Sequence, residues 1–432
     1  MTREAERADS WRRAIGDCLD AAGSEVVTRL RAAELAETYR ALDLEGRRDF
    51  LSLLAEEFGP DPGAVATEIE SWQQADDAAS RIDAERRLRL ALRPPYRHLF
   101  TQFNAVPDRV KFLVDLRADL LAIASRSPEL RALDDALVFV LRSFFDLGFL
   151  TLERITWASP ASLLERLVDY EAVHAIRSWD DLRNRLDSDR RCFALFHPSM
   201  PGEPLAFVEV ALVRGLADSV QRLLDEGAPV GDATRADTAI FYSISSPQKG
   251  LRGISFGEYL IRGAARALRA DLPQLETFAT LSPIPGFRRW LEKSLARGEP
   301  DLDSTLDPAL RDELASALAN PGGFGEGSAQ ASTHSALAAA LRALCAQYFH
   351  ATRGDGTPID AVARFHLRNG ARLEAIHAAA DISPKGLRQS LGLMVNYRYD
   401  PATLETNQEA YETERRIVSS PAVEALLAST AE

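Results

Sequence analysis

The sequence has few cysteines, and they lie far apart. Cys18, Cys192 and Cys345 form no C-x-x-C pair within 432 residues, which argues against a disulfide framework and a cysteine-based zinc site and favours a reducing compartment. The sequence also lacks an H-E-x-x-H motif and clustered D-x-D motifs. We therefore expect chemistry that needs no metal.

Long hydrophobic runs are missing as well. No apolar segment approaches the roughly 20 residues that a membrane-spanning helix needs. The first residues, MTREAERADSWRRAIGD, have no apolar core of the kind found in secretory signals, and the last residues, STAE, are not a peroxisomal signal. We expect a soluble, cytoplasmic protein that does not act on a membrane.

The chain has fewer basic than acidic residues. The chain has 51 lysine and arginine residues against 64 aspartate and glutamate residues, a formal net charge of −13. Nucleic-acid binding needs a net basic face, so this balance argues against nucleic acid as a partner, although a few arginines around one turn would suffice for a small anion. The share of apolar residues, 46%, is that of an ordinary globular protein, and the length favours two or three domains.

Residues 1–147 have the pattern of an all-α helical bundle. Apolar residues recur at helical spacing from Asp9 to about Phe145, and proline-containing breaks at 59–62, 94–95 and 127–128 separate the helices. No motif there suggests chemistry. We expect a packing or oligomerisation domain.

Residues 148–432 are predicted to form a mixed sheet with helices on its faces, so that the fold class is α+β with two domains. FLTLERITW, CFALFHP, PLAFVEVALV, TAIFYSIS and ETFATL have the composition of strands. With the helices between them they give the order β-α-α-β-β-β-α-β-α, which is the order of the GNAT-like (acyl-CoA N-acyltransferase-like) fold. Residues 298–335 are predicted to be a flexible surface insertion with a helix near Pro308 to Ala319.

The most informative segment is SSPQKGLRGISFG, between the strand TAIFYSIS and the following helix. Its glycines, Gly250, Gly253 and Gly257, should leave backbone N–H groups uncovered at a helix N-terminus, where they would attract a pyrophosphate, and Lys249 and Arg252 could pair with phosphate oxygens. The turn lacks the dinucleotide G-x-G-x-x-G, the P-loop G-K-[ST] and the Q/R-x-x-G-x-G/A of acetyl-CoA-dependent N-acyltransferases. A tight turn that uses glycine only for backbone freedom is the alternative.

Two residues are candidates for acid–base chemistry. Ser282, in TLSPIPGF, is expected at a strand end beside the glycine turn, where a phosphate-binding turn and a hydroxyl together suggest an acyl-CoA site; a plain turn or N-cap is the alternative. His366, in RFHLRNGA, can meet Ser282 only through tertiary folding, and His197 is its rival. Tyr397 and Tyr399, in NYRYDP, are further candidates because of their hydroxyl groups. The alternative is that they are core residues whose hydroxyls have hydrogen-bond partners.

Several of these segments together resemble the malonyl-CoA decarboxylase family. They are HPSMPGEPLAFVEVAL, ADTAIFYSISSPQKGLRGISFGEYLI, LSPIPGFRRWL, RFHLRNGARL and GLMVNYRY, and the resemblance extends from about Gly148 to Asp400. It implies an N-terminal helical domain and a catalytic domain of acyltransferase-like fold that converts malonyl-CoA to acetyl-CoA and carbon dioxide. It implies no cofactor, since coenzyme A is part of the substrate, and a homodimer or homotetramer assembled through the helical domain.

Carried over to this sequence, the resemblance makes Ser282 and His366 catalytic and places Tyr399 near the active site. Animal members of the family carry a glutamate where this chain has Ser255, so no role of a carboxylate is transferred to that position. The family's CoA-binding turn corresponds to Arg252 through Glu258. With the residues that precede it, the predicted binding residues are Lys249, Gly250, Arg252, Gly253, Ile254, Ser255, Phe256, Gly257 and Glu258.

The expected chemistry fits these residues. A malonyl thioester can lose carbon dioxide without a metal or organic cofactor, because the thioester carbonyl takes up the electron pair as an enolate. We expect backbone N–H groups and His366 to face the developing oxyanion. Ser282 would hydrogen-bond the malonyl carboxylate, and the two side chains would relay the proton.

Two other functions use the same fold. An acyl-CoA-dependent N-acyltransferase would need an amine-binding site and a base, for which Glu209 and Glu203 are the candidates. A non-catalytic CoA-ester sensor would work through its helical bundle and would tolerate the loss of Ser282 and His366. The presence of both motif residues favours the decarboxylase.

Overall fold

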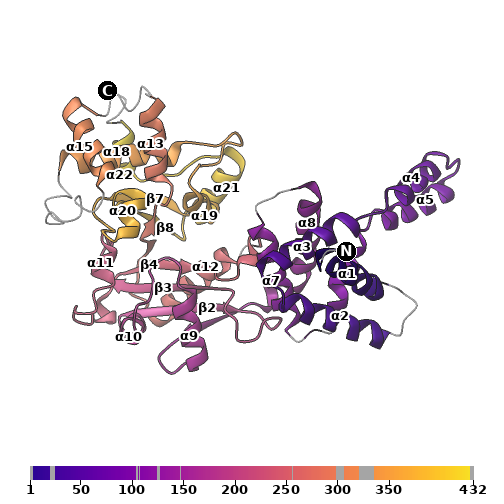
Figure 1. Ribbon diagram of the computed structural model, residues 1–432. Helices are drawn as coiled ribbons and strands as arrows, with labels where there is room; N and C mark the ends of the chain where they lie inside the picture. Colours follow the sequence, from indigo (N-terminus) through magenta and orange to yellow (C-terminus); the bar gives the residue numbers. More distant parts are fainter. Residues whose placement is uncertain are drawn as a thin grey trace. The chain divides into compact units, whose positions relative to one another are not determined.

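The chain divides into two compact units (Figure 1). The computed structural model describes residues 3–19, 25–103, 106, 108–123, 127–145, 147–254, 256–297, 306–320 and 335–428. Unit 1 comprises Met1–Thr151, Phe196–Leu205 and Ser246–Phe256, and unit 2 comprises Leu152–Leu195, Ala206–Ser245 and Gly257–Glu432. Two short segments that follow strands therefore belong to the helical unit.

Unit 1 is helical, as predicted. Its helices begin where the sequence offers caps and prolines: Asp61 accepts a hydrogen bond from the N–H of Gly63, Ser127 accepts one from Leu130, and Pro62 and Pro128 occupy first turns. The helices are α1 (Arg3–Leu19), α2 (Glu25–Arg40), α3 (Leu44–Glu57), α4 (Pro62–Gln73), α5 (Ala78–Ala91), α6 (Pro95–Gln102), α7 (Arg109–Ala122) and α8 (Pro128–Phe144), with the 3-10 turns η2 (Leu147–Phe149) and η4 (Lys249–Leu251).

Pairs of aromatic rings lie in the core of unit 1. Tyr39 and Phe50 pack edge to face with ring centroids 5.2 Å apart, and Phe103 and Phe112 do so at 5.0 Å. The hairpin of α4 and α5 contributes little to this core, because Ala84 is its only buried residue within the two helices.

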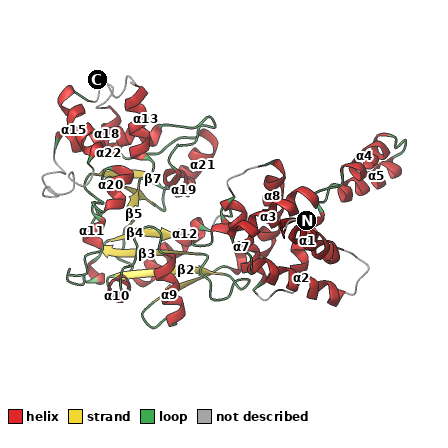
Figure 2. Ribbon diagram, in the orientation of Figure 1, coloured by secondary structure: helices red, strands yellow, loops and turns green. Residues whose placement is uncertain are grey.

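The sheet of unit 2 is mixed (Figure 2). Its order is β1-β2-β3-β4-β5-β8-β6, and β7 also pairs with β8. The strands β2, β3 and β4 are antiparallel, whereas β4 and β5 are parallel and are connected through helix α12. The strands are β1 (Thr151–Ile155), β2 (Arg190–Phe196), β3 (Ala206–Val213), β4 (Thr238–Ser245), β5 (Thr277–Thr280), β6 (Ser282–Pro283), β7 (Arg372–His377) and β8 (Met394–Arg398).

The predicted fold class is confirmed, and the predicted order of elements holds as far as the helix after β5, except that a short helix, Val220–Leu223, and a 3-10 turn lie between β3 and β4. The helices of unit 2 are α9 (Ala161–Tyr170), α10 (Trp179–Arg185), α11 (Val220–Leu223), α12 (Gly257–Asp271), α13 (Phe287–Arg297), α15 (Pro308–Ala319), α18 (Ala336–His350), α19 (Ala361–Arg368), α20 (Pro384–Ser390), α21 (Leu404–Glu414) and α22 (Pro421–Ala428), with the 3-10 turn η3 (Ala233–Arg235). Helix α15 confirms the helix predicted in the insertion, whereas 298–305 and 321–334 lie outside the described residues.

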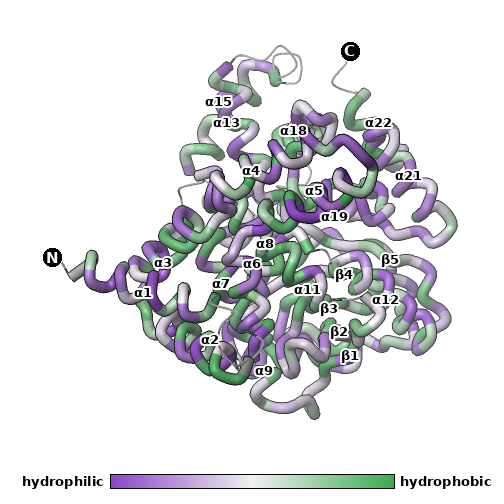
Figure 3. Tube along the Cα trace, turned by 90° about the vertical axis from the view of Figure 1, so that its right-hand side faces the viewer, coloured by the Kyte–Doolittle hydropathy of each residue, from purple (hydrophilic) through white to green (hydrophobic). Residues whose placement is uncertain are grey.

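The central strands are buried almost throughout. β2 is buried over its whole length and β3 over all but its last residue, although β2 begins with two arginines and β3 contains a glutamate. Figure 3 shows hydrophobic segments where β3 and β4 are labelled. On one face, Ile240, Ala279, Leu281 and Met394 share a buried cluster. Among the described residues, no helix has the length and apolar character needed to cross a membrane.

Candidate active site

Ser282 is placed by the end of strand β5. Leu281 turns into the buried cluster on one face of the sheet, so the side chains of Thr280 and Ser282, two residues apart in extended chain, lie together on the other face. The hydroxyl of Ser282 donates to Thr280 Oγ1 over 2.9 Å. Both residues are buried, Thr280 completely.

His366 reaches this point from the last turn of α19. Its Nε2 lies 3.2 Å from Ser282 Oγ. The helix is fixed at its start by Asp360, which accepts hydrogen bonds from the N–H of Ala363 over 2.7 Å and from the hydroxyl of Tyr348 over 3.0 Å. The structure thus brings Ser282 and His366 together across 84 residues of sequence.

Two tyrosines at the end of β8 hold the imidazole. The hydroxyl of Tyr399 lies 2.7 Å from His366 Nδ1, and the ring of Tyr397 stacks on the His366 ring with centroids 4.3 Å apart. Against the expectation of satisfied hydroxyls, the buried hydroxyl of Tyr397 has no hydrogen-bond partner in the described part of the chain. The two tyrosines therefore contribute differently: Tyr399 through its hydroxyl and Tyr397 through its ring.

The cluster is electrically neutral at physiological pH. Burial lowers the pKa of His366 to about 3 and raises the pKa of the Tyr399 hydroxyl well above its usual range, because neither charged form is solvated there. His366 is 2% exposed. The result is a chain of a phenol, a neutral imidazole and two aliphatic hydroxyls, through which a proton can be passed without a buried ion at rest.

The predicted glycine turn is a compact 3-10 turn in unit 1. A Cβ atom on Gly250 would lie 1.8 Å from the carbonyl oxygen of Val114, so only glycine allows this approach to α7. Gly253 has a φ of +85°, which also favours glycine. Glycine is therefore required at both positions for reasons of backbone geometry.

Arg117, which was not among the predicted site residues, holds this turn. Its Nη1 donates to the carbonyl oxygens of Gly250 and Arg252, each over 2.7 Å, and its Nε donates to Asp134 Oδ1 over 2.6 Å. Arg117 is 4% exposed. The available signal was its helical spacing from apolar residues of α7, because Arg117 is the one charged residue among the buried residues of that helix.

The expectation of uncovered N–H groups is wrong for part of the turn. The N–H groups of Leu251, Arg252 and Ile254 bond to carbonyl oxygens within the turn, over 2.8, 3.1 and 2.9 Å. At the start of α12, by contrast, Gly257 and Glu258 lie in the first turn, where no carbonyl oxygen of the helix can accept their N–H groups. Of the N–H groups named here, those of Gly257 and Glu258 are therefore the ones without a partner inside the turn or the helix.

The other predicted binding residues differ in exposure. Lys249 and Arg252 are exposed, and Ile254 is half-buried. Phe256 is buried with its ring 5.6 Å from that of Phe145. Ser255 lies outside the described residues.

The first two residues of α12 are fixed by neighbours in unit 2. Gly257 admits the ring of Phe365, since a Cβ atom there would lie 2.2 Å from Phe365 Cε2. Glu258 forms an ion pair with Arg262 over 3.0 Å.

The rival residues have structural roles. His197 packs against the rings of Phe145 and Phe149, and its Nδ1 accepts the N–H of Ser199 over 3.1 Å. Glu209 is buried on β3 and pairs with Arg185 over 2.9 Å. Burial raises the pKa of Glu209 to about 7.

Glu203, the other base considered for an acyltransferase, lies in unit 1, where the side-chain amide of Gln248 approaches its Oε2 to 3.4 Å. Among the described residues, neither Glu203 nor Glu209 is a hydrogen-bond partner of Ser282 or His366.

One cavity of unit 2 borders the cluster. A space of about 500 Å³ between α12 and the chain after β8 is lined by Tyr399, Phe278 and Leu404, and by Arg262 and Arg269. Tyr399 is the member of the cluster that lines this cavity, whereas Ser282 and His366 are not among its lining residues.

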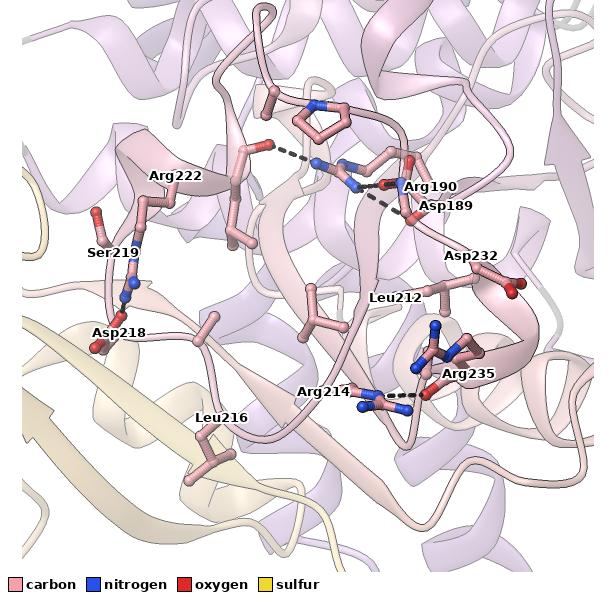
Figure 4. Close-up of a pocket in the computed structure, with 17 residues that line it drawn as sticks. Asp189, Arg190, Leu212, Arg214, Leu216, Asp218, Ser219, Arg222, Asp232 and Arg235 are labelled. Carbon is pink, nitrogen blue, oxygen red and sulfur yellow. Dashed lines mark hydrogen bonds and ion pairs between the residues drawn. The ribbon is translucent and has the colours of Figure 1, made fainter.

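A second cavity, of about 750 Å³, contains none of the predicted site residues (Figure 4). Two ion pairs lie in its wall, Arg190 with Asp189 over 2.7 Å and Arg222 with Asp218. Arg214 and Arg235 also line it, and Arg214 Nε donates to the backbone carbonyl oxygen of Arg235 over 3.3 Å.

Two family models together cover most of the chain. The model "Malonyl-CoA decarboxylase C-terminal domain" matches residues 148–432, and the model "Malonyl-CoA decarboxylase N-terminal domain" matches residues 58–145. The chain belongs to the malonyl-CoA decarboxylase family. The resemblance seen in the sequence is thereby confirmed.

Solved members of the family have the same fold over almost their whole length. The malonyl-CoA decarboxylase from Rhodopseudomonas palustris is 40% identical, with 97% of this chain and 99% of that chain covered and a TM-score of 0.88. The one from Agrobacterium vitis is 39% identical, with 96% and 99% covered and a TM-score of 0.85. The curated mitochondrial malonyl-CoA decarboxylase of Anser anser anser is 37% identical over 418 residues, which are 91% of this chain and 82% of that protein.

Proposed function

We propose that this chain converts malonyl-CoA to acetyl-CoA and carbon dioxide without a metal or organic cofactor. The observation that carries the proposal is the buried cluster of Ser282, His366 and Tyr399, in a chain that belongs to the malonyl-CoA decarboxylase family. The cluster supplies the two things that this reaction needs from a protein, a hydrogen-bond donor for the substrate and a path for one proton.

The reaction consumes one proton. The bond between the carboxylate carbon and C2 of the malonyl group breaks, carbon dioxide leaves, and the electron pair passes into the thioester carbonyl, which becomes an enolate. C2 then takes a proton from the Ser282–His366 pair, and solvent returns one proton to the pair. A preorganised donor at the enolate oxygen is typically worth roughly 10²–10³ in rate, and a positioned acid–base group roughly 10²–10⁴.

Each residue of the cluster has a distinct role in this proposal. Ser282 hydrogen-bonds the malonyl carboxylate and, with His366, relays the proton to C2. His366 acts as a neutral ring, which its pKa of about 3 supports, and it gives and takes protons through two nitrogens. Tyr399 fixes the orientation of that ring from Nδ1.

The coenzyme A moiety is assigned to the segment from Lys249 to Glu258. The exposed cations Lys249 and Arg252 support this, because ammonium and guanidinium groups pair with phosphate oxygens. Ser255 belongs to the same segment.

We also propose a homodimer or homotetramer assembled through unit 1. Support comes from the hairpin of α4 and α5, where Ile69 is 40%, Trp72 42% and Ile82 68% exposed. A reducing, cytoplasmic location is supported by the three cysteines, which are free and buried.

The test is release of carbon dioxide and acetyl-CoA from malonyl-CoA, with a chelator and no added cofactor. Ser282→Ala and His366→Ala should each lower kcat at least about 100-fold. Ser294→Ala, which removes a buried hydroxyl from α13, is the matched control and should leave turnover unchanged. Tight binding of malonyl-CoA by the wild type without any turnover would refute the proposal and favour a sensor or an acyltransferase.

A further inference from the structure

Ser282 has a second side-chain partner besides His366. Its Oγ lies 3.2 Å from His366 Nε2 and 2.9 Å from Thr280 Oγ1. Thr280 is the last residue of β5 and is completely buried. The position of the Ser282 hydroxyl is therefore set by two groups, and the threonine is the nearer one.

Thr280 is itself held by strand β8. Its Oγ1 accepts the backbone N–H of Tyr397 over 3.1 Å, and its carbonyl oxygen accepts the side-chain amide of Asn396 over 2.7 Å. Asn396 is in turn contacted by His377 Nε2 over 2.5 Å. Rotating the Thr280 side chain would leave the buried N–H of Tyr397 unpaired, which typically costs about 1–3 kcal/mol.

A count of hydrogens shows what Thr280 can do for Ser282. With Ser282 as donor, Thr280 Oγ1 accepts two hydrogen bonds, from Ser282 and from Tyr397, which is its full capacity. A carboxylate only accepts hydrogen bonds, so Ser282 must turn its proton away from Thr280 to bind one. The contact between the two hydroxyls then survives only if Thr280 donates its own proton to Ser282 Oγ.

We propose that Thr280 is a positioning residue whose hydroxyl accepts a hydrogen bond from Ser282 in the free protein and donates one to Ser282 when Ser282 binds the malonyl carboxylate. The proposal rests on the decarboxylase function argued above. This role and the bond from the N–H of Tyr397 both require a hydroxyl, and not merely a β-branched side chain, at a completely buried strand position.

Two substitutions separate the hydroxyl of Thr280 from its shape. Thr280→Val keeps the branched shape and removes both hydrogen-bonding roles, whereas Thr280→Ser keeps both roles and removes only the methyl group. We expect Thr280→Val to lower kcat by about 10-fold to 100-fold with KM changed less than about 3-fold, since Thr280 acts through Ser282. Thr280→Ser should keep kcat within about 3-fold of the wild type.

A structural role alone would give a different result. Loss of the hydrogen bond to Tyr397 should lower the Tm of Thr280→Val whether or not the proposal holds, so stability does not decide it. The deciding readout is the solvent deuterium isotope effect on kcat, which should increase in Thr280→Val, because proton transfer through a misplaced Ser282 becomes slower. Should Thr280→Val fail to fold, Thr280→Cys replaces it, since a thiol nearly keeps the size but is a weak donor and acceptor.

The outcomes separate this inference from the proposed function. The role of Thr280 is overturned if Thr280→Val has the kcat of the wild type, or if the valine and serine variants lose kcat equally. In either case, loss of turnover in Ser282→Ala still supports the decarboxylase function. No turnover by the wild type, or full turnover by Ser282→Ala, overturns the proposed function itself.

Discussion

The phenolic oxygen of Tyr399 lies 2.7 Å from His366 Nδ1, while Ser282 Oγ lies 3.2 Å from Nε2 of the same ring. A neutral imidazole carries one proton, so a hydrogen bond donated by Tyr399 to Nδ1 requires the proton to be on Nε2, facing Ser282. With Tyr399 as the donor, the nitrogen of His366 that donates toward Ser282 is therefore Nε2.

Tyr399→Phe should slow turnover without weakening substrate binding. The ring still fills its place, but Nδ1 loses its partner and the imidazole is free to adopt the other tautomer. We expect kcat to fall by about 10-fold to 100-fold with KM changed less than about 3-fold, as measured by acetyl-CoA release under steady-state conditions.

Tyr397→Phe is the matched control for this variant. Its hydroxyl has no hydrogen-bond partner in the described part of the chain, and its ring would still stack on His366. Activity should stay within about 2-fold of the wild type. If the two phenylalanine variants lose activity to the same degree, the hydrogen bond of Tyr399 does not orient His366.

Local sequence signals predicted most of the fold. Helix α8 begins at Pro128 and α15 begins at Pro308, where proline follows a capping side chain in each case. The pairing of β8 with β5 on one side and β7 on the other could not be predicted. This pairing joins segments that lie far apart in the chain. The alternation of apolar and polar residues indicates a strand, but it does not indicate which other strand it pairs with.

The candidate site was predicted only where a motif marked it. Ser282, His366 and Tyr399 lie in unusual sequence segments. Thr280 is a β-branched residue of a kind common in strands, and its importance comes from a hydrogen bond with β8. Arg117 contacts carbonyl groups 133 and 135 residues away. Every residue type has a backbone carbonyl group, so the partner residues of Arg117 do not indicate these contacts in the sequence.

Gly250→Ala should disturb the predicted CoA-binding segment. The new Cβ would lie 1.8 Å from the carbonyl oxygen and 2.6 Å from the carbonyl carbon of Val114, and backbone atoms cannot turn aside as a side chain can. The turn must shift away from α7 and from Arg117. We expect KM for malonyl-CoA to rise at least about 10-fold and stability to fall by about 1–3 kcal/mol, measured by kinetics and by thermal unfolding.

Gly354→Ala is the control for this substitution. A Cβ atom at Gly354 has nothing within 4 Å, so both KM and the midpoint of unfolding should be unchanged. A Gly250→Ala protein that unfolds more easily but binds malonyl-CoA like the wild type would show that the turn is only structural.

The stability of the protein should fall on acidification because of His366. Burial lowers the pKa of His366 to about 3, whereas a histidine in an unfolded chain has a pKa of about 6.5. Between these values the unfolded chain binds a proton that the folded chain does not. The free energy of unfolding is therefore highest above about pH 6.5 and declines below it by at most about 1.4 kcal/mol per pH unit from this residue.

Two other histidines add to the same trend, since burial also lowers the pKa of His174 and of His377. The contribution of His366 is isolated by comparing the wild type with His366→Gln in urea unfolding between about pH 7 and pH 4.5. The glutamine variant should lose stability less steeply as the pH falls. His98→Gln, at an exposed position, is the control for the exchange of histidine for glutamine itself. Equal slopes in the wild type and His366→Gln would mean that the imidazole takes up a proton in the folded state, and that the neutral relay proposed for the reaction is wrong.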